Sequence, residues 1–359
     1  MKRRLAMTDR RYHPALDGLR AVAVICVVLF HAGATSGLAD LAPGGFIGVS
    51  VFFTLSGYLV TTVLLREIDD SGGLDVRRFW ARRIRRLAPA SLTIVVGAVV
   101  LAPLFWAGFR WVDAAAGAFG YTNWHVIVSG ETQLLRTIVG PLGPFWSLAV
   151  EEQFYVLLTV AVLVAVRTKQ PVRTLSIMVA AGWFGSLLVQ LLVSGPQFRL
   201  EFGTDARGTE LLAGCGLALL LHVRPEALQR SAAWLMPAGI VGFVAILALA
   251  TTTDYDPPWL LRGGYAAVSV VSAVLVASLL LPGPLTRLLA QAPFVAVGQM
   301  SYSWYVVHWP IILIMTSDRI GFDGWPLLVA KVVISSVAAA VLHLAIEQPL
   351  RAKRTLIAQ

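Results

Sequence analysis

Long apolar segments separated by short polar links run along almost the whole chain. Each segment is about 16 to 24 residues long, and about 20 apolar residues in a helix cross the hydrocarbon core of a bilayer, which is about 30 Å thick. The pattern predicts an all-α protein, a polytopic membrane helical bundle of about ten transmembrane helices. The ten predicted spans are 16–34, 46–65, 88–109, 146–166, 174–194, 207–222, 232–252, 263–281, 294–317 and 325–346.

The distribution of positive charge orients these spans. With ten spans and the N-terminus inside, 21 of the 29 Lys and Arg residues fall on the inner side and six on the outer side. Cytoplasmic loops of membrane proteins are enriched in Lys and Arg, so we predict that both termini and the 66–87 loop are cytoplasmic and that 129–145 is extracytoplasmic. The apolar segment 112–128, which contains polar residues, is then re-entrant or interfacial and does not cross.

The composition supports the same class. Hydrophobic residues make up 57% of the chain and charged residues 14%, against about 25% charged in soluble domains. Topology explains most of the formal charge of +9, so nucleic acid is not predicted as a partner. Cys26 and Cys215 lie in apolar runs and are interpreted as small core residues rather than a disulfide. The basic N-terminus has no cleavage site, and we predict a retained first span and one membrane domain over 1–359.

Two ionisable residues of the first span are the first candidates for function. Arg20 and His31 lie in a segment apolar enough to cross a bilayer, where ionisable side chains are costly and often functional. Their spacing places them on one stripe of a helix, about 16 Å apart along its axis. The alternative is an Arg that snorkels to the inner interface and a His satisfied by a backbone carbonyl.

Glu151 and Glu152 lie near the outer end of the fourth predicted span. The predicted topology places Glu151 at a depth similar to that of His31. A carboxylate beside a His fixes its tautomer and stabilises the imidazolium, which is the minimal apparatus of general-base catalysis. The alternative is a buried structural ion pair.

Six arginines occupy the ten residues 77–86, on the predicted inner side. They form either an anchor for anionic lipid headgroups or a cradle for a phosphorylated ligand, for which the planar guanidinium is well suited. Two other polar regions are less specific. His308, in an aromatic span with Pro310, is more often structural when it stands alone. The outer loop 203–210, which contains Asp205, Arg207 and Glu210, is either an exposed salt bridge or an acceptor-binding edge.

Taken together, these residues resemble the integral-membrane acyltransferase 3 family, whose members transfer acyl groups to cell-surface sugars, peptidoglycan or small natural products. Six stretches carry the resemblance, in order across nearly the whole chain. They are Leu16 to Arg20 with His31 further on, 44–58, 79–89, 146–155, 301–310 and 346–351. Ser50 departs from the family, which commonly has Asp there. Many relatives also carry an esterase-like domain after the last span; here we expect its role to be dispensable or supplied by another protein.

The resemblance implies a membrane-bound O-acyltransferase of the cell (cytoplasmic) membrane. It would move an acyl group, most simply acetyl, from cytoplasmic acyl-CoA to a hydroxyl of a cell-envelope carbohydrate or small-molecule acceptor. His31 would be the general base and Glu151 its orienting partner. Acyl-CoA is expected as a co-substrate, with no permanently bound cofactor and no metal; membrane lipids complete the expected partners. The predicted donor-binding residues are Arg20, Arg82, Arg83 and Arg86. The predicted supporting or acceptor-binding residues are Asp17, Trp146, Ser147, Glu152, Tyr155, Asp205, Arg207, Ser303 and His308.

The alternatives are a transporter of glycans or lipid-linked precursors and a non-catalytic sensor. The inverted repeat expected of a transporter is not visible, because the Arg-rich motif has no counterpart in the second half. The acceptor, the acyl chain, the side of transfer, a covalent acyl-enzyme and the oligomeric state are left open. Tyr155, Ser303 and His308 are equal candidates to stabilise the developing oxyanion.

Overall fold

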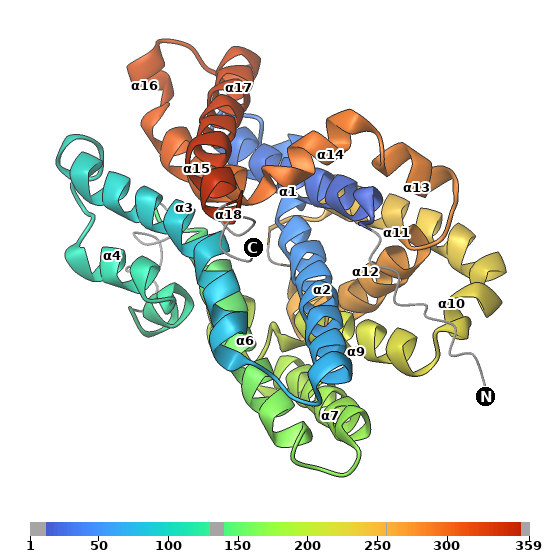
Figure 1. Cartoon of the computed structure of the whole chain (residues 1–359). Coiled ribbons are helices and arrows are strands. Elements are labelled where there is room, and N and C mark those ends of the chain that lie inside the picture. Colours follow the sequence, from blue (N-terminus) through green and yellow to red (C-terminus); the bar gives the residue numbers. More distant parts are fainter. Residues whose placement is uncertain (1–11, 130–139, 256, 353–359) are drawn as a thin grey trace.

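The structure, a computed structural model, describes residues 12–129, 140–255 and 257–352 as a bundle of helices joined by short loops (Figure 1). The first part contains α1 (Pro14–Ala34), η1 (Ala39–Leu41), η2 (Gly45–Ile47), α2 (Gly48–Ser71), α3 (Val76–Phe105) and α4 (Trp111–Ala118). The middle part contains α6 (Phe145–Ala165), α7 (Pro171–Leu192), α8 (Gln197–Phe202), α9 (Gly208–Val223), α10 (Glu226–Arg230) and α11 (Ala232–Thr252). The last part contains η3 (Leu260–Gly264), α12 (Tyr265–Leu279), α13 (Pro284–Leu289), α14 (Ala292–Gln299), α15 (Ser301–Ile314), α16 (Ser317–Ile320), α17 (Gly324–Leu342), η4 (His343–Glu347) and α18 (Gln348–Ala352).

Eight helices in the described residues are long and apolar enough to cross a membrane. This confirms the helical membrane bundle and refines the predicted spans. The span predicted at 207–222 is α9, which has 16 residues. The span predicted at 294–317 is two helices, because α14 ends at Gln299 and the chain turns at Met300 before α15 begins. Hydropathy alone cannot show such a turn, since both sides of it are apolar.

The apolar segment predicted not to cross is also divided. α4 has eight residues, which makes it about 12 Å long. The chain then turns at Gly120, whose φ of 67° is in the left-handed region, and is helical again at 122–129. Most of the predicted extracytoplasmic segment 129–145 lies outside the described residues.

α1 lies at the centre of the bundle and contacts α2, α14, α15 and α17 (Figure 1). α2 in turn packs closely on α9. A Cβ atom at Gly57 would lie 1.9 Å from the carbonyl oxygen of Leu211, and one at Gly214 would lie 2.0 Å from that of Thr54. Small residues that let backbones approach are typical of helix contacts in membranes. α9 therefore covers one side of α2. Another side of α2 packs against α1 and α6.

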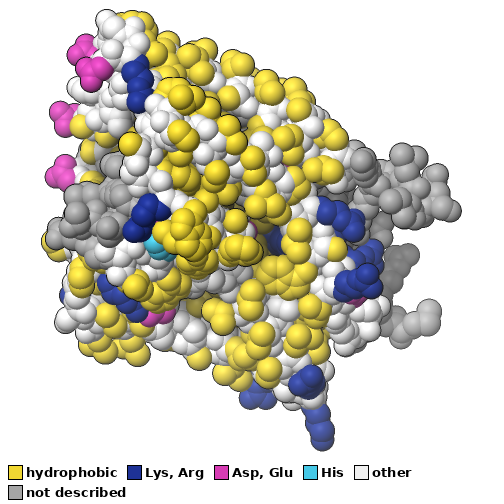
Figure 2. Space-filling model, turned by 90° about the vertical axis from the view of Figure 1, so that its left-hand side faces the viewer, with side chains coloured by type: hydrophobic (Ala, Val, Ile, Leu, Met, Phe, Trp, Pro, Cys, Tyr) yellow, Lys and Arg dark blue, Asp and Glu magenta, His cyan; other side chains and the backbone are white. Residues whose placement is uncertain are grey.

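The outer surface of the bundle fits a lipid environment. Val96, Val100 and Leu104 of α3 are more than half exposed. Figure 2 shows one face with a broad band of hydrophobic side chains; acidic side chains gather mostly at its left edge, and Lys and Arg lie on its left side, at its right edge and below. Dark blue atoms are visible in a hollow near the middle of this face. The hydrophobic side chains on the surface therefore face lipid, and we look for the functional side chains inside the bundle.

Candidate active site

A cavity of about 270 Å³ lies among α1, α2, α3, α6 and α15. It brings together ionisable residues from three helices: Arg20 of α1, Arg83 and Arg86 of α3, and Glu151 and Tyr155 of α6. Its other polar lining residues are Ser56, Ser147, Ser301, Tyr302 and Tyr305. The cavity therefore contains three cations and one carboxylate in a membrane-embedded bundle, and its charge suits an anionic ligand.

The three arginines are held mainly by neutral partners. Nε of Arg20 donates to Oγ of Ser301 at 3.2 Å. The guanidinium of Arg83 lies 4.1 Å from the ring centre of Tyr155, a cation–π contact. Nε of Arg86 is buried with no hydrogen-bond partner in the described structure. No ion pair involves these arginines within the described ranges, so their charge is available to a ligand.

Arg82, which was predicted to join them, lies elsewhere. Its Nη2 forms an ion pair with Glu67 of α2 at 2.9 Å. Successive helical residues differ by 100° around the axis, so Arg82 points away from the direction of Arg83. Arg82 ties α3 to α2 and does not line the cavity.

Glu151 also has partners other than the one predicted. Its carboxylate accepts hydrogen bonds from the hydroxyls of Ser56 and Tyr155. The sequence led us to expect Glu151 beside His31, and the structure places it on the cavity wall instead. The expectation rested on the depths of the two residues in the membrane, estimated from the ends of the predicted spans. Ser147, one turn earlier on α6, contacts the hydroxyl of Tyr305 at 2.6 Å.

His31 is hydrogen-bonded to His308. Its Nδ1 lies 3.0 Å from Nε2 of His308, which is fully buried on α15. Nδ1 of His308 lies 2.6 Å from the carbonyl oxygen of Tyr305 and 3.2 Å from that of Trp304. A carbonyl can only accept, so Nδ1 of His308 carries the proton and its Nε2 is an acceptor. The proton between the rings therefore belongs to Nδ1 of His31, and Nε2 of neutral His31 is unprotonated.

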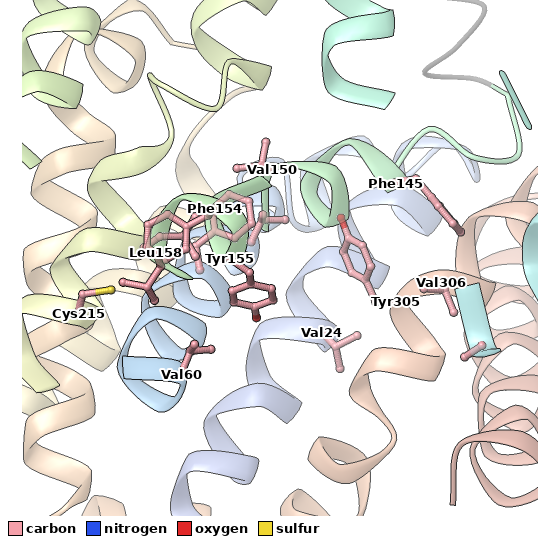
Figure 3. Close-up of a cluster of buried hydrophobic side chains, with 14 of the residues drawn as sticks. Val24, Val60, Phe145, Val150, Phe154, Tyr155, Leu158, Cys215, Tyr305 and Val306 are labelled. Atoms are coloured by element: carbon pink, nitrogen blue, oxygen red, sulfur yellow. The ribbon is translucent and has the colours of Figure 1, made fainter. Parts of the chain in front are cut away.

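Ser147 and Tyr305 separate the cavity from the two histidines. Their hydroxyl oxygens are 2.6 Å apart, and the Tyr305 hydroxyl also donates to the carbonyl oxygen of Pro144 at 3.0 Å. The ring of Tyr305 is 5.6 Å from that of His308. Figure 3 shows Tyr305 of α15 directed toward α6. Tyr155 lies further along α6. The cavity thus runs from the arginines to a pair of hydroxyls beside the histidines.

The charged residues of the predicted loop 203–210 form two ion pairs, and the one within the loop, between Arg207 and Glu210, is buried rather than exposed. Asp205 accepts two hydrogen bonds from Arg199, at 2.8 and 2.7 Å, and these bonds raise the pKa of the Arg199 guanidinium above its ordinary value. Arg207 is buried and forms an ion pair with Glu210 at 2.7 Å. It also donates to Ser50 Oγ at 3.2 Å, the position where the family commonly has Asp.

The surroundings of Arg207 indicate a structural centre. Its guanidinium lies 3.7 Å from the ring centre of Tyr265 and 5.3 Å from that of Trp146. It also donates to the carbonyl oxygen of Glu201 at 3.1 Å. A buried cation with a carboxylate, a carbonyl and aromatic faces is compensated locally. Arg207 and Trp146 therefore join α2, α6, α9 and α12.

Three other predicted residues lie outside the cavity. Asp17 accepts a hydrogen bond from Tyr12 near the start of α1. Glu152 lines a separate small space beside Gly120. Ser303 donates to the buried carboxylate of Glu347 at 2.8 Å. The structure gives these residues local partners and does not bring them to the histidines.

Four residues near the site were not singled out from the sequence. Ser56 and Ser301 lie within motifs that carry the family resemblance, and Tyr305 lies within the same motif as His308. Lys331 was noticed only as a charge within a span, although that position is itself the signal of a functional group. Their contacts depend on neighbours more than 80 residues away in sequence.

Comparisons with known proteins agree with the six motifs. An acyltransferase domain family model (Acyl_transf_3) matches residues 13–345. The chain is 31% identical over 363 residues to the O-acetyltransferase OatA of Staphylococcus aureus (strain NCTC 8325 / PS 47), covering 98% of this chain and 59% of that protein. It is 34% identical over 357 residues to the putative peptidoglycan O-acetyltransferase YrhL of Bacillus subtilis (strain 168), covering 95% and 55%.

A third relative is the peptidoglycan O-acetyltransferase OatA of Listeria monocytogenes serovar 1/2a, which is 35% identical over 327 residues, covering 88% of this chain and 51% of the relative. The chain thus spans between about half and three fifths of the length of these curated relatives. No solved structure matches it. The family model covers nearly the whole chain, and the cavity unites residues of five of the six motifs. On this evidence the chain belongs to the acyltransferase 3 family of integral-membrane proteins.

Proposed function

We propose that this chain is the membrane domain of an O-acetyltransferase of the bacterial cell membrane, moving an acetyl group from cytoplasmic acyl-CoA to a hydroxyl of peptidoglycan. The observation that carries the proposal is one cavity that runs from three arginines to Ser147 and Tyr305, with the ring of Tyr305 5.6 Å from that of His308. The relatives named above are O-acetyltransferases, two of them named for peptidoglycan. That acceptor is the one to test first.

The arginine end of the cavity is suited to the phosphates of the donor. Arg20, Arg83 and Arg86 line one cavity, and guanidinium groups form charge-assisted hydrogen bonds with phosphate oxygens. Because Nε of Arg86 is buried without a partner in the described structure, a ligand oxygen would satisfy it. Leaving such a group unsatisfied costs about 1–3 kcal/mol, so the cavity favours a ligand that accepts hydrogen bonds.

The other end of the cavity is suited to the acyl group. Arg20 and His31 are about 16 Å apart along α1, a distance that an extended donor arm must bridge. With its phosphates at the arginines, the donor would direct its thioester toward Ser147 and Tyr305. Ser147, rather than Tyr155 or Ser303, is then placed to stabilise the developing oxyanion, by turning the proton that it gives to Tyr305 toward the thioester oxygen. Tyr155 lies beside Arg83, and Ser303 is bonded to Glu347.

The histidine pair provides the base. Nε2 of His31 takes the proton of the acceptor hydroxyl while the oxygen attacks the thioester carbonyl carbon. The C–S bond then breaks, the thiolate leaves as coenzyme A, and the proton returns from His31 to the sulfur. The imidazolium formed on His31 donates through Nδ1 to His308, which is itself fixed by the Tyr305 carbonyl. His308 therefore performs the orienting role that the sequence led us to assign to Glu151.

Purified protein in detergent or nanodiscs tests the proposal. We expect it to release free coenzyme A from labelled acetyl-CoA in the presence of peptidoglycan fragments, and to transfer the label to them. His31→Ala should abolish transfer and retain acetyl-CoA binding. Release that does not depend on the acceptor, or transfer that survives in His31→Ala, would contradict the mechanism. Movement of a glycan across the membrane without acetylation would support a transporter instead.

A further inference from the structure

Lys331 is an intramembrane cation with no part in the mechanism above. It lies on α17 and its side chain is fully buried. Its Nζ donates three hydrogen bonds, to the carbonyl oxygen of Thr35 at 2.7 Å, to Oγ1 of Thr35 at 2.9 Å and to Oγ of Ser36 at 3.1 Å. An ammonium group has three donors, so all of them are used, and all are directed to the end of α1.

The residues that Lys331 binds are one helical turn beyond His31. Thr35 is the C-cap of α1, and its Oγ1 donates to the carbonyl oxygen of His31 at 2.8 Å. A cation at a helix C-terminus interacts favourably with the unpaired carbonyls and with the helix dipole. Lys331 therefore fixes the last turn of α1, the turn that carries the proposed base.

One turn along α17, Ser335 makes a matching contact with the other histidine helix. Nε1 of Trp304 donates to Oγ of Ser335 at 3.0 Å, and both side chains are buried. Trp304 lies one turn before His308 on α15, and its carbonyl oxygen is 3.2 Å from Nδ1 of His308. Residues four apart lie on the same face of a helix, about 6 Å apart along the axis. One face of α17 thus contacts both helices that carry the histidines.

We propose that α17 positions the histidine pair, with Lys331 and Ser335 as positioning residues that set the distance between His31 and His308. The effect of this positioning on catalysis rests on the proposed function. The positioning of the two imidazoles does not depend on it. If the contacts of Lys331 or Ser335 are removed, one imidazole shifts relative to the other. A small shift is enough to break the 3.0 Å contact between Nδ1 of His31 and Nε2 of His308. Lys331 touches neither the cavity lining nor the acyl donor.

The geometric part is tested by solid-state ¹⁵N NMR of histidine-labelled protein in lipid. In the wild type we expect a hydrogen-bond signature that links one nitrogen of His31 to one of His308. Lys331→Met should remove it. If Lys331→Met does not fold, Thr35→Val carries the test, because Thr35 is exposed and the change removes only Oγ1. Thr35→Ser, which keeps the hydroxyl, should restore the signature.

The catalytic part is tested by steady-state kinetics on the same variants. Lys331→Met and Ser335→Ala should lower kcat at least 10-fold and leave the KM for acetyl-CoA within about twofold. Ser336→Ala is the matched control, because Ser336 is only partly buried and its hydroxyl donates to the carbonyl oxygen of Val333 on its own helix; it should behave as the wild type. Folded variants that keep the NMR signature and normal kcat would overturn the inference. If the wild type shows the signature but no transfer, the proposed function fails and the positioning is supported.

Discussion

Replacing His308 by Ala tests the central geometric claim, that His308 orients His31. The side chain is fully buried, accepts the Nδ1 proton of His31 at 3.0 Å and donates to the Tyr305 carbonyl at 2.6 Å. The variant leaves His31 without its partner while the cavity lining stays intact, because His308 does not line the cavity. Catalysis should fall and donor binding should remain.

The magnitude follows from the charge that forms during reaction. When His31 takes the acceptor proton, its hydrogen bond to His308 becomes a bond from an imidazolium. Hydrogen bonds to charged groups contribute about 1.5–3 kcal/mol, and 1.36 kcal/mol is a factor of ten in rate, so kcat should fall roughly 10- to 150-fold. His308→Gln places an amide oxygen near the position of Nε2 and should recover part of this loss.

The assay measures acceptor-dependent release of coenzyme A, with the Kd for acetyl-CoA and the melting temperature recorded on the same preparations. His222→Ala is a matched control, since His222 lies on α9 with Asp69 as its neighbour at 3.7 Å. A folded His308→Ala protein with kcat within threefold of the wild type would refute the assigned role. Loss of donor binding together with kcat would instead make His308 part of the donor site.

Two further predictions concern the donor site and the topology. Arg83→Gln combined with Arg86→Gln should weaken coenzyme A binding roughly 100-fold or more, because two charge-assisted bonds of about 1.5 kcal/mol or more are lost. Arg85→Gln is the control, because Arg85 is exposed. If the control weakens binding as much as the double variant does, the arginines have a lipid-anchoring role instead. A cysteine at Asp254 should react with an impermeant thiol reagent in intact cells and one at Asp75 should not, because positive charge orients the 66–87 loop inward; Asp254 labelled only after lysis would reverse the topology.

The sequence by itself determined the class of the protein and pointed to most of the charged residues that line the cavity. Apolar runs of helical length are a property of local composition, and the burial of Arg20 within such a run is visible without a structure. The acyltransferase motifs likewise lie in short contiguous stretches. Three of the four arginines predicted to bind the donor, Arg20, Arg83 and Arg86, line one cavity in the structure.

Only the tertiary structure decided which residues face one another. Depth along a span can be estimated from sequence, but the rotation of each helix and its crossing with its neighbours cannot. Glu151 was expected at His31, but the packing of α6 gives its carboxylate the hydroxyls of Ser56 and Tyr155 instead. Arg82 differs from Arg83 by 100° around one helix and so leaves the cavity for Glu67.

The pairing of His31 with His308 has the same origin. The two residues are 277 positions apart. Each belongs to a motif of the family, but neither motif indicates that the two side chains meet. Their contact requires that α1 and α15 pack on each other, and α17 packs on both of them, with Lys331 and Ser335 among its contacts. Hydropathy and motif spacing carry no information on that packing, since it arises from side-chain contacts among helices that are all equally apolar.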